Sequence, residues 1–190
     1  MKIFKKILVT VIAMTMVFTL AACGGSDNAG SEEGKEFTSA VDLLTEVYNG
    51  FDEDYQFPVA GGSSDAMNEE GPGAFTVGDG VELNQSMHFP MEYMGNIEEA
   101  ATMFHLMNAN TFAAGAYKID GDMKEIADAF VDEIDKTQWI CGFPEVFVVV
   151  KAGDYMVSAF GDSDLIDEFV KQIESKVANT EVIVNHPISE

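Results

Sequence analysis

The feature that most limits the fold is an unbroken apolar run, Val146 to Val150. The turn Ala152-Gly153-Asp154 follows it and leads into a second strand-like segment, Tyr155 to Phe160. A short continuous apolar run that ends at a turn is typical of a strand buried on both faces of a sheet. The two segments therefore predict adjacent strands, the first of them fully buried.

Helices and further strands are expected on both sides of this pair. Thr111 to Ile119 has strand character, and Asp122 begins a helix with Glu125 at the capping-box position. Ser163 begins another helix, and Glu181 to Val184 forms a last short strand. This order is that of a ferredoxin-like βαββαβ core at about 111–185. The predicted class is α+β, a two-layer sandwich with additional N-terminal helices.

This topology creates one conflict. Its second strand lies at a sheet edge, yet Val146 to Val150 is the most apolar strand of the chain. A bare apolar edge invites aggregation. Either another part of the chain covers it, for example a helix at 37–48, or a partner does, or the strand order differs.

The N-terminal half carries weaker signals. Apolar residues at helical spacing predict the helix at 37–48, and a second helix is expected from Asn96 to Met107 with Glu99 at its capping-box position. Between them, 74–77 and 81–83 could pair as a hairpin across Gly78-Asp79-Gly80.

The first residues read as an export signal. MKIFKK carries three lysines, an apolar run follows at 7–20, and Leu20-Ala21-Ala22-Cys23 comes next. These four residues resemble the lipobox of bacterial lipoproteins, in which the cysteine receives a diacylglycerol with acyl chains such as palmitate. The resemblance implies a signal peptide at 1–22, a lipid anchor on Cys23, and a location on the outer face of the cytoplasmic membrane. A Gly/Ser-rich linker at 23–36 and one α+β domain at 37–190 complete the predicted organisation.

The charge balance limits the partners. From Cys23 onward the chain has no arginine and seven lysines against 33 acids, a formal charge of −26. Nucleic acid is excluded because phosphate binding needs clusters of lysine or arginine. Cations, basic protein surfaces and neutral ligands stay open as partners, and the acidity can equally serve solubility.

Metal chemistry has only weak candidates. His88, Met91 and His105 offer ligands suited to copper(I), but their spacing is irregular. Acid clusters at 52–54, 120–122 and 162–164 lack the EF-hand pattern for calcium. Cys141 has apolar neighbours in the sequence and is expected to be a buried small hydrophobe. No metal site and no cofactor are predicted.

Catalytic motifs are missing. The chain has no G-x-S-x-G nucleophile, phosphate loop or dinucleotide fingerprint, so no catalytic residue is assigned and the protein is not expected to be an enzyme.

The stretch from Pro90 to Glu174 resembles a lipoprotein family of Gram-positive bacteria that is described as a domain of unknown function. The resemblance is carried by a proline before a short helix, the strand 113–118, the acidic helix Met123 to Lys136, and the hairpin Val146 to Phe160. It implies one surface-tethered α+β domain and no active residue.

Three hypotheses follow for the function. The first is a non-enzymatic binding or accessory lipoprotein for a protein partner or membrane complex. The second is a solute- or metal-cation-binding lipoprotein, and the third is a hydrolase that uses carboxylates.

Overall fold

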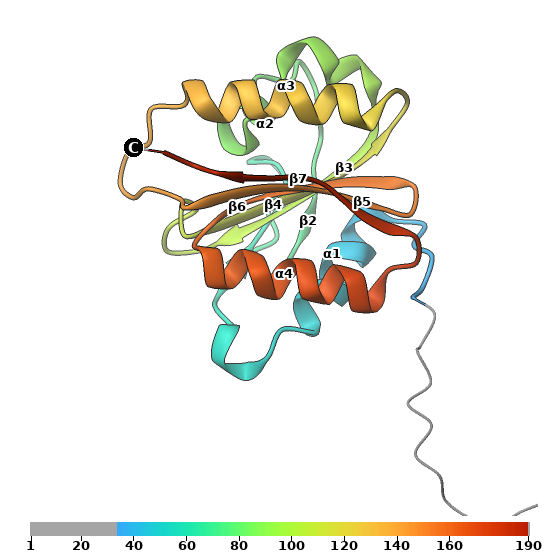
Figure 1. Ribbon diagram of the computed structural model, residues 1–190, viewed down its shortest axis with the longest axis vertical. Coiled ribbons are helices and arrows are strands. Elements are labelled where there is room, and N and C mark those ends of the chain that lie inside the picture. Colours follow the sequence, from blue (N-terminus) through green and yellow to red (C-terminus); the bar gives the residue numbers. More distant parts are fainter. Residues whose placement is uncertain (1–33, 190) are drawn as a thin grey trace, which may run out of the picture. The chain divides into compact units, whose positions relative to one another are not determined.

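The computed structural model describes residues 34–189, which form three layers (Figure 1). An antiparallel sheet of seven strands lies in the middle. Helices α1 (Ala40–Asn49) and α4 (Ser163–Lys176) cover one face, and α2 (Val81–Met87) and α3 (Met123–Lys136) cover the other. The α+β class predicted from the sequence is confirmed, but the predicted two layers are wrong, because helices cover both faces of the sheet and make three layers.

The sheet has the order β1-β3-β4-β6-β5-β7, and β2 also pairs with β3. The long strands are β3 (Ile97–His105), β4 (Phe112–Ile119), β5 (Val146–Ala152), β6 (Tyr155–Gly161) and β7 (Thr180–Pro187). The short strands β1 (Val59–Ala60) and β2 (Gly73–Ala74) lie along the outer side of β3. Two 3-10 turns, η1 (Glu53–Tyr55) and η2 (Met91–Asn96), complete the fold.

The element order from residue 112 onward is the predicted βαββαβ, but the strand order is not that of a ferredoxin-like sandwich. The last strand, β7, pairs with β5 along its whole length, from Val146↔Pro187 to Ala152↔Thr180. As a result β5 lies between β6 and β7 and is not an edge. The conflict over the apolar run is resolved by the third alternative, because this chain's own last strand supplies the missing neighbour.

The helix predicted from Asn96 to Met107 is wrong, since this segment is strand β3. Its apolar residues face both ways: Ala100 and Phe104 pack toward α3, while Ala101 and Met103 pack toward α1 and α4. Because helices cover both faces of the sheet, β3 lacks the alternation of apolar and polar residues by which a half-buried strand is recognised in a sequence. Glu99 does cap a helix, but a distant one, because its carboxylate accepts the backbone N–H of Ala40 at 2.8 Å.

The predicted hairpin at 74–83 is also wrong. Gly73 and Ala74 pair with β3, and the second half of the segment begins helix α2, which buries Leu83 and Met87 against the sheet. A helix this short carries too few residues for its periodicity to be read from the sequence. The three longer helices are confirmed within a few residues, and Asp122 caps α3 through the N–H groups of Lys124 and Glu125.

The strands define two ends of the sheet. At the entry end the chain joins the domain: Lys35 bridges Val177, and Gly153 of the β5–β6 turn donates its N–H to Asn179. Residues 34–36, within the predicted linker, are therefore held against this end. At the far end lie the β3–β4 loop (106–111) and the α3–β5 loop (137–145). The seven residues of β5 separate the two ends by about 20 Å, at about 3.3 Å per residue.

Candidate functional site

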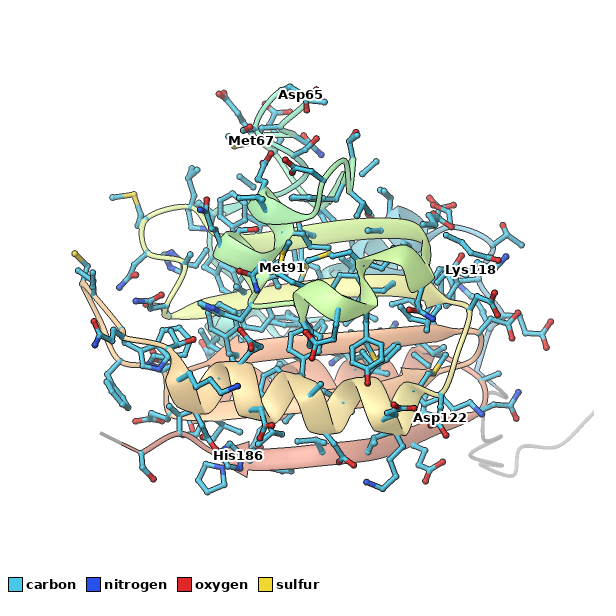
Figure 2. The ribbon with its side chains drawn as sticks, turned by 90° about the horizontal axis from the view of Figure 1, so that it is seen from above. Asp65, Met67, Met91, Lys118, Asp122 and His186 are labelled. Carbon is cyan, nitrogen blue, oxygen red and sulfur yellow. The ribbon has the colours of Figure 1, made fainter. Side chains whose placement is uncertain are left out.

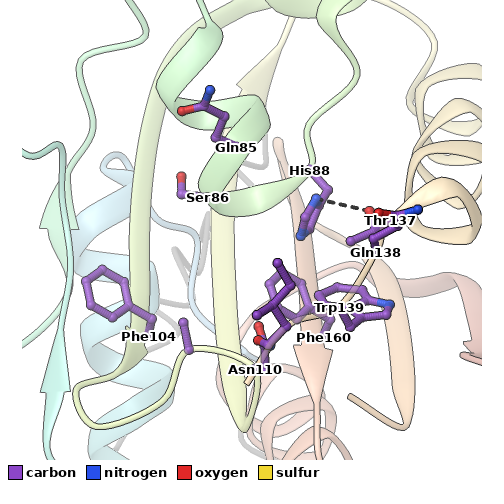
Figure 3. A pocket seen from close by; sticks show the side chains of 11 residues that line it. Gln85, Ser86, His88, Phe104, Asn110, Thr137, Gln138, Trp139 and Phe160 are labelled. Carbon is purple, nitrogen blue, oxygen red and sulfur yellow. Dashed lines mark hydrogen bonds between the residues drawn. The ribbon is translucent and has the colours of Figure 1, made fainter. Parts of the chain in front are cut away.

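A pocket of about 360 Å³ opens at the far end of the sheet, on the α3 face (Figure 3). Its lining comes from α2, β3, the β3–β4 loop, the α3–β5 loop and β6: Gln85, Ser86, His88, Phe104, Ala109, Asn110, Thr137, Gln138, Trp139, Ile140 and Phe160. Apolar and aromatic side chains predominate, with a few amides and hydroxyls between them. This composition and volume are typical of a site for a small molecule or a protruding side chain.

Three aromatic rings form one side of the pocket. The ring of His88 lies 4.9 Å from that of Trp139 and 5.4 Å from that of Phe160, and Trp139 and Phe160 are 5.2 Å apart, measured between centroids. The contacts are edge-on or tilted, which are favourable geometries for aromatic pairs. The rings thus hold one another in place.

The ring of His88 contacts Thr137 at the edge of the pocket. The hydroxyl of Thr137 lies 2.9 Å from the carbonyl of Glu133, to which it can donate, and 3.3 Å from the Nδ1 of His88. Burial lowers the pKa of His88, and the nearby Glu133 carboxylate only partly opposes this, so the ring is neutral near pH 7.

Two asparagines join the loops of the far end. The amide of Asn110 donates to the carbonyls of Ile140 at 2.8 Å and Gly142 at 3.1 Å, and that of Asn108 donates to the carbonyl of Cys141 at 3.1 Å. The prediction that Cys141 is buried is wrong, because it is exposed and has a left-handed backbone with φ 66°. Its neighbours Ile140 and Phe143 are exposed on the same loop and give it no core to enter.

Large apolar side chains project from these two loops. The exposed fractions are 80% for Met107, 76% for Ile140, 47% for Leu106 and 39% for Phe143. We call these four residues the far-end patch. Its Ile140 also lines the pocket, so patch and pocket are continuous. Exposed apolar surface of this kind marks an interaction site more often than an isolated exposed leucine does.

Charge is distributed unevenly between the two ends. Five of the seven described lysines lie at the entry end: Lys35, Lys118, Lys124, Lys151 and Lys176. Figure 2 shows Lys118 and Asp122, where α3 begins, on the same side of the molecule. The far end carries the acids Asp52, Glu133, Asp135, Glu145, Asp162 and Asp164. The lysines nearest to it are ion-paired, Lys136 with Glu133 and Lys171 with Asp52. Of these acids, Glu133 is near enough to act on His88, and it is ion-paired with Lys136.

The three weak metal candidates do not form one site. His88 packs on the α3 face, whereas the ring of His105 stacks on Phe57 at 4.8 Å on the opposite face of the sheet. Met91 is exposed on η2 (Figure 2). Within residues 34–189 no three histidine, cysteine or acidic side chains are grouped so that they could hold a metal ion. Of these candidates the structure brings only His88 into the pocket.

An acidic cavity of about 330 Å³ lies on the α4 side, lined by Asp52, Tyr55, Asp164, Asp167, Glu168 and Lys171. Burial opposes ionisation of Glu168, but hydrogen bonds from Lys171, Gln172 and the backbone of Asp52 outweigh it, so its pKa lies below the ordinary value. Glu168 is thus an ion-paired carboxylate. A carboxylate hydrolase needs a carboxyl group that stays protonated, and Glu168 is unsuited to that role.

Sequence reasoning missed most of the pocket. Trp139, Phe160, Asn110 and Thr137 come from separate elements and share no motif spacing. The single signal was a lone tryptophan beside the exposed Ile140, in a segment without helical or strand periodicity.

Comparison of the chain with protein-family models, with curated proteins and with solved structures yields no match. Among the described residues, no helix has the length and apolarity needed to cross a membrane. Cys23 and the predicted signal peptide lie outside the described residues.

Proposed function

We propose that the protein is a lipoprotein anchored through Cys23 on the outer face of the cytoplasmic membrane, where it acts as a non-enzymatic binding module for a protein partner. The observation that carries this proposal is the position of the far-end patch and its pocket. They lie about 20 Å from the place where the chain enters the domain, at the opposite end of the strands.

This arrangement suits a tethered binder. A chain anchored through residues before Lys35 is attached at the entry end, so the far end is the end of the sheet most distant from the attachment. The pocket is then accessible to a partner in the extracytoplasmic space.

The exposed side chains of the far end indicate what kind of partner surface would bind there. An exposed apolar patch beside an aromatic pocket accepts a buried anchor side chain, which is how most protein interfaces concentrate their binding energy. The formal charge of −26 from Cys23 onward favours basic residues around that anchor. We therefore expect a partner surface with an apolar or aromatic anchor and flanking lysine or arginine.

A free solute is the second candidate for the same pocket. Its volume of about 360 Å³ lies within the range of small-molecule sites, about 300–1,000 Å³. The far-end patch favours a protein partner over a solute, since a small solute that binds in the pocket needs no exposed apolar surface around it.

Photo-crosslinking on membranes tests the proposal. The full chain, produced in its own host, carries a benzophenone amino acid in place of Ile140. The matched control carries it at Met67, an exposed apolar residue on the 61–74 segment (Figure 2). We expect one discrete adduct from position 140 and none from position 67.

Two further variants complete the experiment. Adding Met107→Asp places a charge in the far-end patch and should reduce the position-140 adduct at least tenfold, while Cys23→Ser should release the chain from the membrane. Equal adducts from both positions, or none from position 140, would refute the partner-binding role.

A further inference from the structure

The outer side of β7 is an open edge of the sheet. Within residues 34–189, β7 pairs with β5 alone, and no second segment pairs with its other side. Proteins usually protect such an edge with lysine, proline or a bulge, because its unpaired N–H and C=O groups can bind another strand. β7 contains no lysine, and its proline is its last residue, Pro187. It does contain a bulge at Ile183, which has no partner on β5.

Hydrogen bonds at both ends of β7 determine which of its backbone groups face outward. In an antiparallel ladder, successive residues alternately bond to the neighbouring strand and face away from it. Ile188 donates its N–H to the carbonyl of Glu145 at 2.9 Å, and Asn179 accepts the N–H of Gly153 at 3.3 Å, so both residues face β5. Alternation from these two residues, with the bulge between them, leaves four positions that face outward: Thr180, Val182, Asn185 and Pro187.

This spacing determines which strand can pair along the whole edge. The outward positions are two residues apart except across the bulge, where they are three apart. A regular strand offers bonding groups at every second residue, so its ladder with β7 would break at the bulge. A second β7 that runs antiparallel has the same irregular spacing and matches it throughout. In this register Val182 of each copy lies opposite Asn185 of the other, and Thr180 lies opposite Pro187, whose carbonyl can still accept.

The polar side chains of β7 are complementary in the same register, because Glu181 of each copy lies opposite His186 of the other. Both residues are on the α3 face. Glu181 borders a groove with Lys124, and the Nε2 of His186 lies 2.8 Å from a carboxylate oxygen of Asp135 (Figure 2). The Nδ1 of His186 is then available to the Glu181 carboxylate of the other copy. Complementary polar pairs across an antiparallel ladder stabilise it, whereas two like charges oppose it.

We propose that the protein forms a two-fold symmetric dimer in which the β7 strands of two copies pair antiparallel and join their sheets into one. The formal charge of −26 on each chain opposes association, and salt screens this repulsion over a Debye length of about 8 Å at physiological ionic strength. The antiparallel joint places the two far-end patches at opposite ends of the joined sheet. Residues 23–34 span at most about 40 Å when extended, so both chains can attach to one membrane.

Paired cysteines test this register in the full chain, produced in its own host and oxidised on membranes. Val182 is 40% exposed and Asn185 is exposed, so neither substitution disturbs the core. Cys141→Ser first removes the exposed native thiol. A chain with both Val182→Cys and Asn185→Cys should form disulfide-linked dimers, because Cα atoms of facing residues lie about 5.5 Å apart. The two cysteines of one strand are about 10 Å apart and cannot join.

The two single-cysteine variants are the matched controls. In the proposed register, two copies of Val182→Cys alone place their thiols three residues apart along the joint, about 10 Å, so this variant should stay monomeric. Asn185→Cys alone should also stay monomeric. Collisions between chains on the membrane would instead link all three variants equally.

A charge exchange tests the polar pair. In the double-cysteine chain, His186→Glu places two acids opposite each other and should reduce the linked dimer about fivefold. Adding Glu181→Lys exchanges the two charges and should restore the dimer. A linked dimer that responds to neither change would overturn the pairing of Glu181 with His186.

Dimers from the double-cysteine variant alone support the inference. Dimers from either single-cysteine variant, or only monomers from the double-cysteine variant, overturn it. The far-end patch is not part of the joint, so this result and the crosslinking from position 140 can succeed or fail separately.

Discussion

The two ends of the sheet are built from similar parts but differ in what they expose. At the entry end a tight turn at Gly153 and the carboxylate of Glu99 tie β3, β6 and α1 together, and lysines lie around them. At the far end longer loops are joined by asparagine amides and expose Met107 and Ile140. Polar contacts close the entry end, whereas the loops of the far end expose apolar side chains to solvent. This contrast teaches that the same sheet can be stabilised at one end and used for binding at the other.

The contrast is tested most strongly at Glu99. Its carboxylate accepts the N–H of Ala40 at 2.8 Å and the O–H of Tyr155 at 3.1 Å. We expect Glu99→Ala to lower the free energy of unfolding by about 1.5–3 kcal/mol, because hydrogen bonds to a charged group are lost and their donors are left without a partner. Urea unfolding gives this value.

The neighbouring Glu98 is the matched control. It forms only an exposed ion pair with Lys118 at 3.7 Å, so Glu98→Ala should cost less than about 0.5 kcal/mol. Equal losses for the two variants would mean that Glu99 does not organise the entry end.

A smaller effect is expected from the asparagines that join loops at the two ends. Asn110→Ala removes two amide-to-carbonyl bonds at the far end and should cost about 1 kcal/mol, with faster hydrogen exchange confined to 137–145. Asn96, whose amide donates to the carbonyl of Asp120, is its entry-end counterpart. Asn96→Ala should leave hydrogen exchange at 137–145 unchanged. Faster exchange there would mean that the two ends are not stabilised independently.

The smallest effect is the pH dependence contributed by His88. Burial holds its folded pKa below the ordinary 6.5, so the unfolded chain binds the proton more readily. The contribution of the neutral ring to stability is therefore complete above about pH 6.5 and is lost as the pH falls toward the folded pKa. The difference in unfolding free energy between the wild type and His88→Asn should shrink between about pH 7.5 and pH 5.5. A difference that is independent of pH would place His88 in a solvated environment.

The sequence by itself determined the local elements. Asp122 begins α3 and Ser163 is the first residue of α4, as expected. The β5–β6 hairpin followed from an apolar run and a glycine turn. These signals are local, because capping, helical periodicity and turn geometry involve residues a few positions apart.

Only the tertiary structure decided where β7 pairs, that 97–105 is a strand, and that the pocket exists. The pairing of β7 with β5 joins Val146 to Pro187, and nothing in either segment specifies its partner. Burial of β3 on both faces depends on helices from distant parts of the chain. The pocket gathers His88, Trp139 and Phe160 from three elements, so no spacing in the sequence could reveal it. Contacts between remote residues are selected by the packing of the whole domain, which a local pattern does not encode.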